Sequence, residues 1–307
     1  MRFKVKSSLK YYLKTFSVRR VVAFIAPLLV ILGITLWLKF TFQNWVGLLL
    51  ILSLGLLHGC NDLRIIKFYR PNNHSKLYFL YVLIAILAVT FFFYIPLAVL
   101  VIFGILSCYH FGEQHWINSR DIGNGRFYIL SFCTGLSILS LIFCLNLLQT
   151  QDAIYALFEI TVSKHVFYSL LSLSLLCTGL VFSQSNTITI SKSEFLFEAL
   201  RWATLLSIFF MGNLVISFAT YFVFFHSIPS IQFQLAHTPD KTKNYPLISF
   251  LKNTWIVYLL SISGCLVVFW IYGANEISFG YFMMGFLIAL ASSHTILFHL
   301  FNVTQKQ

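Results

Sequence analysis

Long apolar runs separated by short polar segments recur from one end of the chain to the other. Ten of these runs approach the length of about twenty residues that a helix needs to cross a bilayer. The short alternating segments of a membrane β-barrel are not visible. The pattern therefore predicts an all-α polytopic transmembrane bundle with spans at residues 21–40, 42–58, 77–94, 95–112, 127–148, 166–182, 196–212, 214–233, 254–272 and 279–300.

This pattern is compatible with eight to ten full crossings of the membrane. Several runs are short and some neighbouring runs have almost no connecting loop, so eight crossings with re-entrant pieces fit the sequence as well. Residues 21–307 are expected to form a single transmembrane domain. Residues 1–20 form a basic tail whose apolar residues recur at helical spacing opposite lysines, which is typical of a helix lying on the cytoplasmic membrane surface.

Composition and charge agree with a membrane protein. Hydrophobic residues make up 59% of the chain and charged residues 10%, whereas a soluble domain has about a quarter charged residues. The net charge of +12 lies in the tail and in alternate loops, where it indicates topology and lipid contact and not nucleic-acid binding. Threading ten spans from an inside tail places most basic residues on one side, so both termini are predicted to be cytoplasmic. The six cysteines form no CxxC and are interpreted as buried thiols without a disulfide framework.

Four histidines lie near the inner ends of spans that all run from outside to inside: His58, His110, His226 and His294. Each is 12 to 16 residues from the outer end of its span, about 18–24 Å at 1.5 Å per residue. A single membrane histidine often only bonds across a helix pair. Four imidazoles in one slab of the membrane instead indicate a metal site, and imidazole suits iron, copper, zinc and nickel alike.

Polar neighbours could orient these histidines. Asp62 follows His58 by four positions and Glu113 follows His110 by three, so each would share the histidine's face if the helix continued. Either carboxylate could accept the second ring N–H of a ligand, although both could also be solvated at the membrane edge. Pro229 cannot donate to the carbonyl of Phe225, which leaves another acceptor beside the site.

The fourth ligand is not decided by spacing, because ligand geometry is tertiary. His294 has the matching depth, His115 lies past a glycine near the surface, and His299 is five residues beyond His294 and is expected at the interface. The remaining histidines, His74, His165 and His237, are interpreted as loop or span-edge residues.

At these residues the chain resembles the Brp/Blh family of membrane β-carotene 15,15′-dioxygenases. The resemblance rests on "HGCND", "SCYHFGEQHW" and "YFVFFHSIPS" in that order, with a late histidine in "SSHTILFH", and runs from about residue 40 to residue 300. It implies Fe(II)-dependent cleavage of the central double bond of β-carotene by O₂, giving two retinal molecules. The implied ligands are His58, His110 and His226, with His294 as the fourth.

The same resemblance implies a lipid-dissolved carotenoid and O₂ as partners, the bacterial inner (plasma) membrane as the location, and room for a protein that accepts retinal. The chain departs from the family in two motifs. Ser230 stands where the third motif commonly has a second histidine, and His115 stands where the second motif often has aspartate. Both are expected to lie beside the ligands, together with Asp62 and Glu113.

Two other functions fit parts of the pattern. A transporter or channel could use the histidine cluster for a metal ion or protons, but it would need a polar route to both faces. Here the polar residues gather at one depth and the outer half is almost wholly apolar, which favours a catalyst that takes its substrate from lipid. A b-type haem protein with paired histidines is the third interpretation, since such a haem needs no CxxCH.

Overall fold

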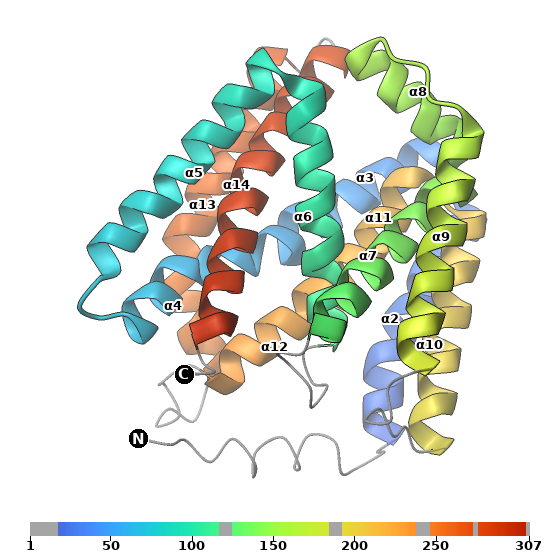
Figure 1. Cartoon of the computed structure of the whole chain (residues 1–307), viewed down its shortest axis with the longest axis horizontal. Helices are drawn as coiled ribbons and strands as arrows, with labels where there is room; N and C mark the ends of the chain where they lie inside the picture. The colour runs from blue at the N-terminus through green and yellow to red at the C-terminus, as the bar shows by residue number, and fades with distance from the viewer. Residues whose placement is uncertain (1–17, 117–124, 184–191, 238–245, 273–275, 305–307) are drawn as a thin grey trace.

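The computed structural model describes residues 18–116, 125–183, 192–237, 246–272 and 276–304, and these residues form an all-α bundle without strands (Figure 1). Its first half consists of α2 (Val18–Trp37), α3 (Phe40–Leu50), η1 (Ile51–Gly55), η2 (Gly59–Asn61), α4 (Asp62–Tyr69), α5 (His74–Tyr94), α6 (Pro96–Trp116) and α7 (Gly125–Leu145). The second half consists of α8 (Leu147–Phe158), α9 (Lys164–Ser183), α10 (Lys192–Met211), α11 (Leu214–Tyr221), η3 (Phe222–Ser227), α12 (Ile228–His237), α13 (Pro246–Tyr272) and α14 (Glu276–Thr304).

The predicted fold class is confirmed. Within the described residues, eight helical segments are long and apolar enough to cross a membrane, and two shorter apolar helices, Ile25–Trp37 and Ala199–Met211, lie at the remaining predicted spans. All six cysteines are free. Residues 1–17 of the basic tail lie outside the described residues, so its placement on the membrane surface stays a prediction. The cytoplasmic position of both termini stays a prediction as well.

Two of the crossing segments are built from several helical pieces. Thr41–Phe68 includes α3, the π-helical turn η1, the 3₁₀ turn η2 and α4, while Leu214–Leu235 runs through α11, the π-helical turn η3 and into α12. The sequence pattern predicts apolar runs at 42–58 and 214–233 without a change of helical turn, because hydrophobicity does not reveal one, and it does not predict that the first segment continues to Phe68. Wide π turns inside α-helices are frequent at functional sites. The π turn η1 ends three residues before His58, and the π turn η3 contains His226.

Helices α6 and α7 pack closely through two glycines. A Cβ added at Gly112 would lie 1.7 Å from the carbonyl oxygen of Ser131, and a Cβ added at Gly135 would lie 1.8 Å from that of Cys108. Each helix thus presents two small residues four positions apart, an arrangement that lets membrane helices approach. Because His110 lies between Cys108 and Gly112, this contact sets its position in the bundle.

A buried polar network joins α2, α3 and α11. The Gln43 side chain donates to the carbonyls of Thr35 and Leu38, both at 3.1 Å, and its Oε1 accepts from the backbone N–H of Asn213 at 2.9 Å. The Asn213 side chain in turn accepts from the N–H of Ile216 and caps α11. Backbone groups freed at the ends of these helices are therefore satisfied within the protein, as an apolar surrounding requires.

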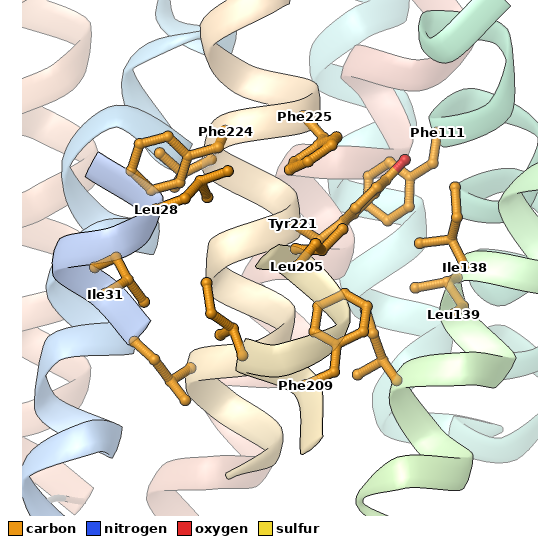
Figure 2. Packing of buried hydrophobic residues seen from close by; sticks show 14 of the residues in the cluster. Leu28, Ile31, Phe111, Ile138, Leu139, Leu205, Phe209, Tyr221, Phe224 and Phe225 are labelled. Carbon is orange, nitrogen blue, oxygen red and sulfur yellow. The ribbon is translucent and has the colours of Figure 1, made fainter. Parts of the chain in front are cut away.

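Between these helices lies the largest apolar cluster. Figure 2 shows side chains of this cluster from α2, α6, α7, α10, α11 and η3, including Leu28, Ile31, Phe111, Ile138, Leu139, Leu205, Phe209, Tyr221, Phe224 and Phe225. Phe224 and Phe225 directly precede His226, so the packing of this core holds the turn that carries the histidine.

Gly112→Ala is expected to destabilise the protein by about 2–3 kcal/mol, because the new methyl group overpacks the contact with α7. Gly104→Ala on the same helix is the matched control, since a Cβ there meets nothing within 4 Å. A helical Gly→Ala change without a clash is neutral or stabilising by up to about 1 kcal/mol. Thermal unfolding of both variants in one detergent measures the difference, and equal midpoints would contradict the close approach of α6 and α7.

Candidate metal centre

The four predicted histidines meet in the interior of the bundle. Their ring centroids form a closed circuit in which His58 lies 4.9 Å from His226 and 4.7 Å from His294. His110 lies 4.7 Å from His226 and 5.2 Å from His294. Neighbouring rings are steeply inclined, at 69° to 89°, so they meet edge to face and do not stack. All four side chains are buried.

The nitrogen positions fit a metal ion. The potential ligand atoms of His58, His226 and His294 all lie within 4.8 Å of one another. The Nε2 atoms of His58 and His226 are 3.3 Å apart. Two nitrogens bound to one ion at about 2.0–2.1 Å, with angles between 90° and 110°, are themselves about 3 Å apart. His110 is not one of the three residues whose ligand atoms are grouped in this way, but its ring lies against those of His226 and His294.

His58 is oriented by the π turn that precedes it. Its Nδ1 makes a short hydrogen bond with the backbone carbonyl of Gly55, the last residue of η1. Because a carbonyl can only accept, Nδ1 carries the proton and Nε2 keeps its lone pair. Nε2 is the nitrogen that lies 3.3 Å from Nε2 of His226, so the local backbone fixes which nitrogen of His58 faces the other imidazoles.

His226 lies within the second π turn, η3. The side chain of Ser227 donates to the carbonyl of Phe222 at 2.9 Å, and the N–H of Ile228 reaches Val223, five residues back. Pro229 follows immediately and has no N–H to offer the chain behind it. The π turn shifts the bonding pattern just before the proline, which lets the helix continue into α12.

His294 of α14 is held by Asp62 at the start of α4. Its Nδ1 lies 2.8 Å from Oδ2 of Asp62, and the same oxygen accepts a hydrogen bond from the Tyr81 hydroxyl at 3.0 Å. Asp62 is 1% exposed. The structure thus places Asp62 against His294 and not against His58, because the 3₁₀ turn Gly59–Asn61 interrupts the helix on which both would have shared a face.

Gln234 of α12 is a site residue that the sequence analysis did not identify. Its amide donates to the carbonyl of His58 at 2.9 Å and lies 3.4 Å from the Ser230 hydroxyl, while its Oε1 accepts from the Asn61 side chain at 3.0 Å. A signal existed, since His226, Ser230 and Gln234 recur every four residues and so share one face of a helix. Tyr81 offered no such signal.

Aromatic rings cover one side of the imidazoles. Phe222 stacks on His226 with ring centroids 5.5 Å apart and meets His58 edge-on at 5.6 Å. Phe111 contacts His226 edge-on at 5.0 Å. A Cβ at Gly55 would lie 2.7 Å from the Phe222 ring, so a larger residue would displace this aromatic wall. The wall restricts ring rotation and keeps this side of the site apolar.

The other predicted neighbours have separate places. Glu113 is buried and accepts a hydrogen bond from Tyr109 at 3.1 Å. Ser230 is buried beside Gln234. His115 lies away from the four-histidine circuit, with its ring 5.9 Å from Trp202 of α10.

The remaining histidines do not enter the circuit as far as the structure describes them. His165 is exposed and His74 bonds locally with Pro71. The side chains of His237 and His299 lie outside those that are described.

Comparison with known proteins identifies the family. The model of the beta-carotene 15,15′-dioxygenase family matches residues 49–302, which include all four histidines. No curated protein and no solved structure matches the chain. Because the family match spans most of the 307 residues and includes the buried histidine circuit, the chain belongs to the beta-carotene 15,15′-dioxygenase family.

Proposed function

We propose that the protein is a non-haem iron oxygenase that cleaves the central double bond of β-carotene, or of a related carotenoid, with O₂ to give retinal. The observation that carries the proposal is the circuit of four buried imidazoles in a chain of the carotene dioxygenase family. In this proposal, His58, His110, His226 and His294 hold Fe(II).

Iron is the metal that best combines this donor set with oxygen chemistry. Neutral imidazoles also suit zinc, but Zn²⁺ has no redox chemistry of its own. Fe(II) bound to four histidines would supply the activation of O₂ and would retain coordination positions for it.

The residues of the chain hold, orient and shield the site. Gly55 and Asp62 accept the outer ring protons of His58 and His294, so that in each ring the other nitrogen faces inward. Phe222 and Phe111 exclude water from one side. Asp62 and Glu113 serve to orient and to balance charge in this proposal, and neither is assigned a proton transfer.

The substrate is expected to arrive from lipid. A carotenoid is apolar along its whole length and dissolves in the bilayer, and the imidazoles belong to membrane-crossing segments. Binding along the polyene could place one double bond at the centre, which is how positioning lowers a barrier. The expected location is the bacterial inner (plasma) membrane, with retinal leaving through lipid or to an accepting protein. Family membership does not favour the transporter or channel interpretation.

Replacing any one of His58, His110, His226 or His294 with alanine is expected to reduce retinal formation in carotene-producing cells to background, because the ion loses a ligand. His165→Ala is the control, since His165 is exposed on α9. Chromatography of retinal and β-carotene, normalised to membrane protein, measures the effect. Full activity in one of the four variants would remove that residue from the ligand set.

Protein purified without oxygen is expected to contain about one iron per chain, as a single four-histidine centre requires. Chelation should abolish cleavage of added β-carotene, and Fe(II) should restore it while Zn(II) should not. Elemental analysis and single-turnover product chromatography measure both quantities. Undiminished cleavage after complete removal of iron would contradict the proposal, and a Soret band would favour the haem interpretation instead.

A further inference from the structure

One carboxylate oxygen joins three elements of the bundle at the edge of the centre. Oδ2 of Asp62 accepts from Nδ1 of His294 at 2.8 Å and from the hydroxyl of Tyr81 at 3.0 Å. These residues belong to α4, α14 and α5. Among the described residues, the basic side chain in contact with Asp62 is that of His294, so neither lysine nor arginine competes with the histidine for this oxygen.

The chemistry of the three groups fixes the direction of each hydrogen bond. An ionised carboxylate can only accept, so both the tyrosine O–H and the histidine Nδ1–H must donate to it. With its proton on Nδ1, a neutral His294 keeps the lone pair on Nε2. Because Nδ1 contacts Asp62, Nε2 is the nitrogen left for the neighbouring imidazoles. The rings of His58 and His110 lie 4.7 Å and 5.2 Å from that of His294.

The geometry points to Tyr81 as a positioning residue that acts through Asp62 on His294 and so keeps Nε2 of His294 ready to bind the metal. This inference rests on the proposed function, since it assumes that the four-histidine circuit holds an ion. Tyr81 and Asp62 are not catalytic residues here, because they reach the centre through the His294 ring. We name this chain of hydrogen bonds, Tyr81–Asp62–His294, the α5 relay.

Tyr81 is suited to this role by its surroundings. It packs against a small apolar cluster of Ile65, Ile66 and Leu297, where water does not compete for the carboxylate. Without the tyrosine hydroxyl, Asp62 could rotate its charge away from His294. With it, the same carboxylate oxygen has a second donor that holds it in place.

The same helix provides a matched control. Tyr78 packs against the same apolar cluster, but its hydroxyl donates to the backbone carbonyl of Leu63 at 2.8 Å and not to Asp62. Tyr78→Phe therefore removes a partly buried tyrosine hydroxyl and its hydrogen bond from α5, as Tyr81→Phe does, and leaves the α5 relay intact.

The test is titration of the ion-free full-length protein in lipid nanodiscs with Co²⁺, followed by its visible absorption. Tyr81→Phe is expected to weaken Co²⁺ binding by about 3-fold to 10-fold, and Asp62→Asn by about 10-fold to 100-fold. Both should change the Co²⁺ spectrum, because the orientation of one ligand changes. Tyr78→Phe should match the wild type in affinity and in spectrum. Thermal midpoints recorded alongside separate loss of binding from loss of fold.

Equal affinity and spectrum for Tyr81→Phe and the wild type would overturn the inference, and so would an equal loss in Tyr78→Phe. A second measurement does not depend on any ion: ¹⁵N NMR of histidine-labelled ion-free protein, with the His294 signal assigned by its absence in His294→Gln. Protonation at Nδ1 supports the α5 relay and protonation at Nε2 overturns it. A protein that binds Co²⁺ as expected but forms no retinal would overturn the proposed function and leave the relay standing. A wild type that binds no Co²⁺ would overturn both the metal centre and the relay's role at it.

Discussion

The imidazole nitrogens of four histidines have to be accommodated inside a bundle that offers them little water, and the rest of the site follows from this constraint. Each ring has two nitrogens, and burying one without a partner is costly. For His58 and His294 the outer nitrogen is satisfied by the Gly55 carbonyl and the Asp62 carboxylate. The other ring nitrogens then face the neighbouring imidazoles, and the proposed cation would satisfy them there. The acceptors behind the rings and the proposed cation between them would together satisfy both nitrogens of a buried imidazole.

The bundle meets this constraint with local departures from regular helices. The π turn η1 ends at the very carbonyl that orients His58, and the π turn η3 contains His226 itself. A wider turn rotates the following residues relative to a continuous α-helix, which changes the direction of the side chain without ending the span. On α6 the feature is a close helix contact: Gly112 lets α7 approach, and this contact sets the position of His110. Three of the four histidines thus depend on a backbone feature within a few residues.

The sequence was sufficient for the helices and for selecting the four histidines that come together, because both depend on local quantities: the length of an apolar run and the position of a residue along it. It was not sufficient for the partners. Asp62 shares a face with His58 on a regular helix, but the 3₁₀ turn between them directs Asp62 to His294, which is 232 residues away in the sequence. Tyr81 could not be found by any spacing rule, since its role arises only when α5 packs beside α4 and α14. Gln234 could have been found from its spacing to His226. That spacing is informative only if the helix continues past Pro229, which the sequence did not show.

One of the buried acidic residues lies directly against the proposed metal centre. The chain has nine aspartates and glutamates, and among the described residues the two that are buried are Asp62 and Glu113. A buried carboxylate costs several kcal/mol unless an opposite charge compensates it. Asp62 contacts His294 directly, whereas Glu113 accepts a hydrogen bond from Tyr109. Four neutral imidazoles contribute no charge, so the proposed divalent ion would balance the Asp62 carboxylate. The attraction between the Asp62 carboxylate and this ion would lower the cost of burying each charge in the low-dielectric interior.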